Sequence, residues 1–179
     1  MSTGLAFDLD MSRGLELQYM RPAMVLRRAR ALELCDPKLG EDALDIGSGP
    51  GFLTADLAAG VGARGSVLGI DQSDAMIQLA QNRCADWPRA KIEMRDAADL
   101  GGEPDRFDLV VSTQVLEYVA DIDQAISEIA RVLRPGGRAV ILATDWRSVA
   151  WYSSDEMRMA RMLSAWEEHL AHPTLPRTL

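Results

Sequence analysis

The sequence contains few residues of the kinds that bind metals or form disulfides. Its 179 residues include 2 cysteines and 2 histidines. Cys35 and Cys84 are far apart, and neither has a second Cys or His at the spacing of a zinc site. His169 and His172 lie near the C-terminus, where we interpret them as surface residues. The sequence therefore predicts no metal site and two buried free thiols.

Long apolar runs and an excess of basic residues are also absent. No apolar stretch has the roughly 20 residues that cross a bilayer. Residues 1–10 carry two acidic and no basic side chains, which is unlike a secretory signal. The net charge of -8 and a pI near 4.8 disfavour nucleic acid as a partner. We expect a cytoplasmic protein that binds neither nucleic acid nor a membrane.

One basic cluster runs against this acidic background. It falls on a single predicted helix, and its members are Arg21, Arg27, Arg28 and Arg30. We interpret it as a solvated helix face in preference to a binding patch.

The composition is otherwise that of an ordinary globular domain, with 47% hydrophobic and 26% charged residues. We found no internal repeat, linker or low-complexity tract, so we expect one domain over residues 1–179. Within it, residues 1–20 are interpreted as an N-terminal arm, and residues 145–179 as an aromatic loop followed by a C-terminal helix.

Strand-like and helix-like segments alternate along the chain. Apolar runs predict five strands, at residues 43–46, 66–70, 91–95, 107–112 and 138–143. Helical periodicity, with caps at Ser73 and Asp121, predicts helices between them, and Pro22 begins the first helix. This alternation is typical of an α/β fold with a mainly parallel sheet and helices on both faces.

A final helix is predicted after the aromatic loop. Ser153 and Glu156 have the spacing of a capping box. The apolar stripe of this helix consists of Met159, Leu163, Trp166 and Leu170. We interpret the stripe as core or interface packing in preference to a cofactor site.

The stretch Leu44-Asp45-Ile46-Gly47-Ser48-Gly49-Pro50-Gly51 joins the first strand to a helix. Glycines at alternate positions allow the backbone to approach a ligand closely. The helix N-terminus behind them offers free N–H groups and a positive dipole end. This turn therefore suits a nucleotide-like or carboxylate-bearing ligand.

Acidic residues follow the next two strands. Asp71 ends the second strand about 20 residues after Gly51, a spacing at which a carboxylate can bind ribose hydroxyls. Asp96, with the backbone of Ala97, follows the third strand and can meet an adenine edge. The alternative, that Asp71 only caps the next helix, competes with Ser73 for that role. Together these residues predict a nucleoside ligand.

Four motifs also resemble those of a known family, in the right order. They are the stretch from Leu44 to Gly51, then Gly69-Ile70-Asp71-Gln72-Ser73, Phe107-Asp108-Leu109-Val110-Val111, and Leu133-Arg134-Pro135-Gly136-Gly137-Arg138. Over residues 19–144 the chain resembles class I S-adenosylmethionine-dependent methyltransferases, and most of all their ubiquinone/menaquinone-biosynthesis-like, type 11 branch. The resemblance implies a Rossmann-like doubly wound sheet of strand order 3-2-1-4-5. It also implies S-adenosylmethionine as cofactor and S-adenosylhomocysteine as its product.

The resemblance further implies roles for individual residues. Gly47, Ser48 and Gly49 are expected beneath the methionine part of the cofactor, with Asp45 towards its amino group. Asp71 is expected at the ribose hydroxyls, Gln72 and Met76 beside the adenine, Asp96 and Ala97 at its amino edge, and Thr113 and Gln114 on the methionine side.

The expected methyl acceptor is a small, partly apolar molecule. Aromatic residues supply pocket area of defined shape, and the candidates are Tyr118, Trp146 and Trp151. Tyr118 stands where many relatives have a histidine, so a histidine base is not expected there. The catalytic residue is left open, with Tyr118 as the candidate for orienting an acceptor; core packing is its alternative role. With only two cysteines, an arsenite methyltransferase is disfavoured.

The family fold normally continues with a sixth strand and an antiparallel seventh, whereas this chain ends at Leu179. We therefore expect a truncated product that lacks both strands, with a second copy of the chain covering the open edge of the sheet. One alternative function is a non-catalytic domain that binds the cofactor or only associates with itself. The other is an NAD-dependent oxidoreductase, although its G-x-G-x-x-G fingerprint differs from the G-x-G-x-G found here.

Overall fold

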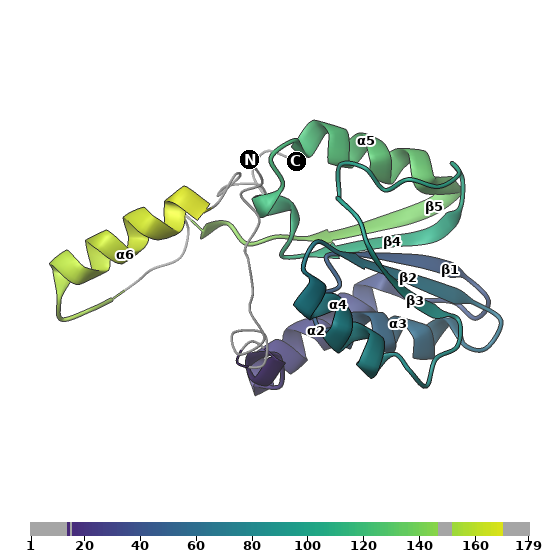
Figure 1. The fold of residues 1–179 in the computed structure, drawn as a ribbon, viewed down its shortest axis with the longest axis horizontal. Coiled ribbons are helices and arrows are strands. Elements are labelled where there is room, and N and C mark those ends of the chain that lie inside the picture. Colours follow the sequence, from purple (N-terminus) through teal and green to yellow (C-terminus); the bar gives the residue numbers. More distant parts are fainter. Residues whose placement is uncertain (1–13, 15, 147–151, 170–179) are drawn as a thin grey trace.

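The computed structural model describes residues 14, 16–146 and 152–169 (Figure 1). In chain order the elements are α2 (Pro22–Cys35), β1 (Asp42–Ile46), α3 (Phe52–Val61), β2 (Ser66–Asp71), α4 (Asp74–Arg83), β3 (Ala90–Met94), β4 (Phe107–Thr113), the 3-10 helix η1 (Leu116–Tyr118), α5 (Ile122–Val132), β5 (Leu133–Leu142) and α6 (Glu156–His169). These bounds agree closely with the expected strands, except that β5 begins earlier, at Leu133.

The five strands form one parallel sheet in the order β3-β2-β1-β4-β5, which confirms the expected topology. In the register, Ile46 of β1 lies opposite Ile70 of β2 and Ser112 of β4. The carboxyl ends of these strands therefore meet at one edge of the sheet, where α/β sheets bind ligands. β5 is the last strand of this sheet, and a second copy covering it remains a prediction.

Two apolar layers cover the two faces of the sheet, as Figure 1 shows for α5 on one side and for α2 and α3 on the other. Alternate strand residues point to opposite faces. Leu44 and Val110 pack with Ala125 of α5, whereas Leu109 packs with Leu57 of α3. This two-sided burial explains the nearly continuous apolar sequence of the strands.

The predicted caps hold for two helices and fail for the third. The Ser73 hydroxyl accepts a hydrogen bond from Met76 N, and the Asp121 carboxylate accepts one from Gln124 N at 3.0 Å. At α6 the carboxylate of Asp155 accepts from Arg158 N at 2.9 Å, so Asp155 caps the helix. The predicted box on Ser153 is wrong, because its hydroxyl accepts instead from Asp155 N.

Helix α6 extends away from the sheet (Figure 1). Met159 and Leu163 are half-buried, and Trp166 remains 36% exposed. The Trp166 ring packs edge-on against Trp146, with ring centroids 5.2 Å apart. The stripe therefore does not enter the core of the described fold, while interface packing remains a prediction. Leu170 lies outside the described residues.

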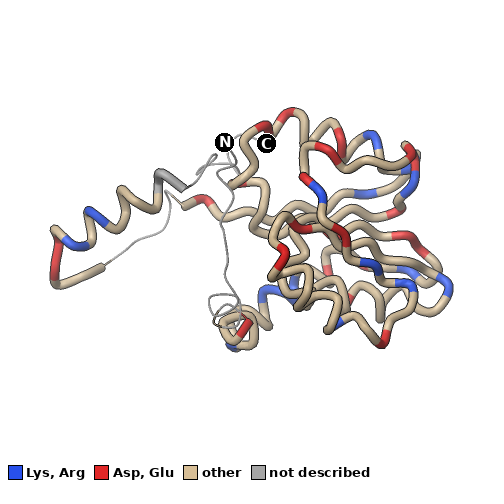
Figure 2. The backbone as a smooth tube through the Cα atoms, viewed as in Figure 1, with Lys and Arg blue, Asp and Glu red and all other residues tan. Residues whose placement is uncertain are grey.

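Several features expected from the composition can be compared with the structure. Both cysteines are buried and free, and burial raises the pKa of each thiol to about 11. Figure 2 shows acidic and basic residues interspersed along the described backbone. Among the described helices, none is long and apolar enough to span a membrane. The same residues contain no cluster of His, Cys, Asp and Glu that could hold a metal ion.

Candidate functional site

The turn after β1 is built from glycines with positive φ. Gly47 has φ of 69°, Gly49 of 51° and Gly51 of 80°, a region that disfavours residues with a side chain. A Cβ at Gly47 would lie 2.2 Å from the Val115 side chain, and one at Gly51 would lie 2.8 Å from the Ala80 backbone. At Gly49 the nearest atom would be the Tyr19 hydroxyl, at 3.8 Å. Among the three glycines of this turn, Gly49 is therefore the one that faces open space.

Asp71 links this turn to the end of β2. Its carboxylate accepts a hydrogen bond from Gly49 N at 2.9 Å through one oxygen and from Ser73 N at 2.9 Å through the other. Ser73 itself caps α4, so the helix does not depend on Asp71 for its cap. A carboxylate has about four acceptor positions, and Asp71 is only partly buried. It can therefore accept further hydrogen bonds from a ligand.

Asp45 lies beneath the turn, near the end of β1. It is 1% exposed and accepts a hydrogen bond from the Thr54 hydroxyl at 2.6 Å. Burial raises the pKa of this carboxyl to about 7; the Thr54 hydrogen bond opposes the rise and the negative charge of Asp71 adds to it. A cation bound beside Asp45 would favour its ionised form.

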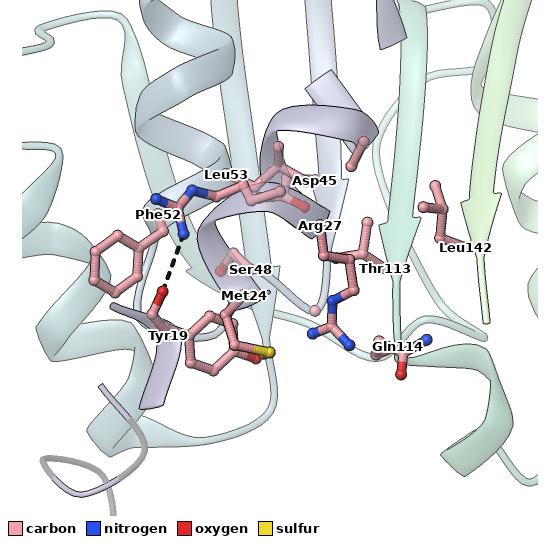
Figure 3. A pocket seen from close by; sticks show the side chains of 13 residues that line it. Tyr19, Met24, Arg27, Asp45, Ser48, Phe52, Leu53, Thr113, Gln114 and Leu142 are labelled. Carbon is pink, nitrogen blue, oxygen red and sulfur yellow. Dashed lines mark hydrogen bonds between the residues drawn. The ribbon is translucent and has the colours of Figure 1, made fainter. Parts of the chain in front are cut away.

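A pocket opens above these residues (Figure 3). Among the residues predicted for the cofactor, it brings together Asp45, Gly47, Ser48, Thr113 and Gln114. The hydroxyl oxygen of Ser48 is buried and has no hydrogen-bond partner within the described part of the chain. An unpaired buried hydroxyl costs free energy, which a polar ligand group in the pocket would recover.

Gln114 forms the wall of the pocket at the end of β4. Its φ of 58° is unusual for a residue with a side chain. The backbone N donates to Leu142 O at 2.7 Å, and the side-chain oxygen accepts from the Thr144 hydroxyl at 2.6 Å. These two contacts hold Gln114 in place from the β5 side.

The residues predicted for the adenine lie outside this pocket, after β2 and β3. Asp96 is exposed and accepts a hydrogen bond from Ala98 N at 2.8 Å, while Ala97 is buried. Gln72 is exposed, whereas Met76 is 2% exposed and has a core position. Of this pair, Gln72 therefore offers the larger surface to a ligand.

The aromatic residues predicted for the acceptor are not gathered in the pocket. Tyr118 is half-buried in η1, and burial raises the pKa of its hydroxyl to about 12. Trp146 is half-buried, and its indole N–H is buried without a hydrogen-bond partner in the described ranges. Trp151 lies outside the described residues. An acceptor site formed by these residues remains a prediction.

The sequence interpretation missed the wall contributed by the N-terminal part of the chain. Tyr19, Met24, Arg27, Arg28 and Phe52 all line the pocket. The Tyr19 and Phe52 rings stack with centroids 6.0 Å apart, and Arg28 pairs with Asp56 at 2.9 Å. Arg27 is exposed, in keeping with the solvated-face interpretation, whereas Arg28 is half-buried; both line the pocket. Contacts so distant in sequence leave no local signal beyond the grouping of the arginines.

The comparisons with known proteins agree with this geometry. A family model described as a methyltransferase domain matches residues 44–141. An uncharacterized 37.1 kDa protein in transposon TN4556 of Streptomyces fradiae is 42% identical over 139 residues, covering 75% of this chain and 40% of that protein. Demethylmenaquinone methyltransferase of Staphylococcus aureus is 36% identical over 117 residues, covering 65% and 48%. The chain thus spans less than half the length of these two relatives.

Solved structures show the same fold. A SAM-dependent methyltransferase from Aquifex aeolicus superposes with a TM-score of 0.69 over 89% of this chain and 87% of its own, at 18% identity. Phosphoethanolamine N-methyltransferase 2 of Haemonchus contortus, in complex with S-adenosyl-L-methionine, has a TM-score of 0.67 and 27% identity, covering 75% and 32%. The chain therefore belongs to the methyltransferase-domain family, within the class I S-adenosylmethionine-dependent methyltransferases.

Proposed function

We propose that this protein transfers a methyl group from S-adenosylmethionine to a small-molecule acceptor. The observation that carries the proposal is the link from Gly49 N to the Asp71 carboxylate at 2.9 Å. It places an open glycine backbone and a partly free carboxylate side by side at the carboxyl ends of β1 and β2. That pairing suits a ribose bound above a close-approaching turn.

The residues present fit this cofactor. We assign the ribose hydroxyls to Asp71, the adenine to Gln72, Met76, Asp96 and Ala97, and the methionine part to Asp45, Gly47, Ser48, Gly49, Thr113 and Gln114. The unpaired Ser48 hydroxyl and the buried Asp45 carboxylate give the pocket polar partners for a charged amino acid group. The pocket is narrow, about 40 Å³, so we expect the side chains that roof it to shift when a ligand enters.

When bound, S-adenosylmethionine supplies a methyl group on a positively charged sulfonium, which a nucleophile displaces in line. The protein residues then position the two reactants and exclude water, and such alignment provides much of the acceleration. Asp45 would hold the cofactor's ammonium, and Gln114 would fix the wall nearest the acceptor. We place the acceptor beside Tyr118, Trp146 and Trp151, whose ring faces suit a partly apolar molecule.

A methyl-transfer assay tests this function. The purified chain is incubated with S-adenosylmethionine and a panel of acceptors, and formation of S-adenosylhomocysteine is measured. The named relatives suggest demethylmenaquinone-type quinols and phosphoethanolamine as two starting compounds. We expect product with at least one small molecule and none with DNA or RNA. Cofactor binding without transfer to any acceptor would instead support a non-catalytic binding domain.

A further inference from the structure

Two side chains of α5 are bonded to the loop between β3 and β4. The Glu128 carboxylate accepts a hydrogen bond from Leu100 N at 3.0 Å. The Arg131 guanidinium donates to the carbonyl oxygens of Gly101 and Gly102, each at 3.1 Å. Three consecutive loop residues are therefore held through their backbones by one turn of a helix that lies 28 to 30 residues later in the chain.

Glu128 and Arg131 also bind each other. The Nε atom of Arg131 donates to one carboxylate oxygen of Glu128 at 2.6 Å, and a terminal nitrogen donates to the other oxygen at 2.7 Å. Glu128 is only 9% exposed. Two parallel hydrogen bonds between a guanidinium and a carboxylate fix their relative orientation. Each side chain therefore sets the direction from which the other meets the loop.

Other contacts hold the same loop from the β3 side. The Arg95 guanidinium donates to Leu100 O and pairs with Glu93 at 2.9 Å. The Arg95 backbone N donates to Asp71 O at 3.2 Å, which ties the start of the loop to the end of β2. Both backbone groups of Leu100 are thus bonded to side chains, and its own side chain is 2% exposed in the core beneath α5.

The segment between these fixed points contains the residues assigned to the adenine. Asp96 is exposed, and its Oδ1 accepts a hydrogen bond from Ala98 N at 2.8 Å. Asp99 N donates to Asp96 O at 3.1 Å, which closes a tight turn. Ala97 is 6% exposed and lies in the same core as Leu100. Because both ends of this short turn are held, the Asp96 carboxylate has little freedom to move.

We propose that Arg131 and Glu128 are positioning residues that fix the Asp96 carboxylate where it recognises the amino edge of adenine. The inference rests on the proposed function, because it assumes that an adenosyl ligand binds at the ends of β2 and β3. Both side chains act through the loop backbone and are not placed in contact with the ligand. A loop ordered before the ligand arrives lowers the entropy cost of binding. The effect falls on the base and not on the ribose at Asp71.

The test compares two ligands that differ at one edge of the base. S-adenosylhomocysteine carries the exocyclic amino group of adenine, whereas S-inosylhomocysteine has a carbonyl oxygen there. The wild type should bind the first more tightly, because a carboxylate accepts a hydrogen bond from the amino group and repels the oxygen. In calorimetric titration we expect Arg131→Gln to weaken S-adenosylhomocysteine binding about three- to tenfold, the range for one lost hydrogen bond. Binding of S-inosylhomocysteine should not weaken.

Two further variants sharpen this test. In Arg131→Lys the ammonium can still pair with Glu128, but it lacks the planar fork that reaches two loop carbonyls as well. We therefore expect this variant to lose the preference for adenine as Arg131→Gln does. Arg30→Gln is the matched control, since Arg30 forms an exposed ion pair with Glu33, also three residues away, on α2. It should leave both affinities unchanged.

The outcomes separate the inference from the function on which it rests. An unchanged preference for adenine in Arg131→Gln, or its full recovery in Arg131→Lys, overturns the inference while the proposed function stands. Equal loss of both ligands with a lower melting temperature indicates a purely structural role and also contradicts it. Equal binding of the two ligands by the wild type shows that Asp96 does not recognise the amino group, and again overturns it. If the wild-type chain binds neither ligand, the proposed function itself fails.

Discussion

The two halves of the site each contain a buried carboxyl group, in different surroundings. On the glycine-turn side, Asp45 lines the pocket and receives a 2.6 Å hydrogen bond from Thr54. On the β4–β5 side, Glu117 in η1 is 0% exposed, and one of its oxygens accepts a hydrogen bond from Thr144 N at 3.5 Å. Its second oxygen has no partner in the described part of the chain. Burial raises the pKa of both groups.

The two sides of the site therefore differ in how many of their buried polar groups are already hydrogen-bonded. On the turn side, Asp71 and Asp45 are already positioned by hydrogen bonds. The turn side retains one unpaired buried polar atom, on Ser48, whereas the β4–β5 side retains three in the described residues, on Ser112, Glu117 and Trp146; each costs about 1–3 kcal/mol. We infer that the turn side is built for the ligand that the whole family shares. We propose that the acceptor binds on the β4–β5 side, beyond Thr113 and Gln114.

The largest loss of stability is expected where the glycine turn contacts the residues after β4. Gly47 and Gly49 both have positive φ, so alanine at either position costs about 1–2 kcal/mol of backbone strain. Only at Gly47 would the new Cβ also collide with Val115, 2.2 Å away, adding about 1–3 kcal/mol of overpacking. We predict that Gly47→Ala lowers the free energy of unfolding by about 2–5 kcal/mol, measured in urea.

Gly49→Ala is the matched control for this prediction. It shares the strain but adds no steric conflict, so we expect a loss near 1–2 kcal/mol. Equal losses in the two variants would show that the turn and the β4 side are not packed tightly together.

A smaller change in the free energy of unfolding is expected when the pH is varied. Both buried carboxyls have a raised pKa in the folded state, so the folded state binds more protons than the unfolded state above pH ~4. Their ionisation therefore lowers stability as pH rises, for Asp45 up to its folded pKa of about 7. Asp45→Asn should remove a slope of up to about 1.4 kcal/mol per pH unit in that window. Glu117→Gln should likewise make the free energy of unfolding depend less on pH.

Added S-adenosylhomocysteine should distinguish the two carboxyls. Its ammonium would favour the ionised form of Asp45, so affinity should rise with pH towards about 7 in the wild type and not in Asp45→Asn. The Glu117→Gln effect on stability should be the same with or without ligand. Affinity that is independent of pH in the wild type would place the ammonium away from Asp45.

The sequence predicted the parts of this molecule that depend on local patterns. Strand order, the glycine turn, the Ser73 cap and the placement of Asp71 follow from periodicity, spacing and family motifs. The pocket wall formed by Tyr19 and Arg27 could not be predicted in this way, because it depends on contacts such as the Tyr19–Phe52 stack that join distant segments. For the same reason the sequence could not decide between core and interface packing for the stripe on α6, which does not enter the core of the described fold. A periodic apolar face shows that a helix is amphipathic, and it does not show what covers that face.

The central claim is that the turn and Asp71 form the adenosyl part of a methyltransferase cofactor site. Calorimetric titration of S-adenosylhomocysteine into the wild type and into Asp71→Asn tests it most directly, with Asp74→Asn at the exposed start of α4 as control. The claim predicts one binding site per chain, at least about tenfold weaker binding in Asp71→Asn because a charge-assisted acceptor is lost, no change in Asp74→Asn, and no response to NADH. Equal affinity in Asp71→Asn and the wild type, or no binding of S-adenosylhomocysteine, would contradict it.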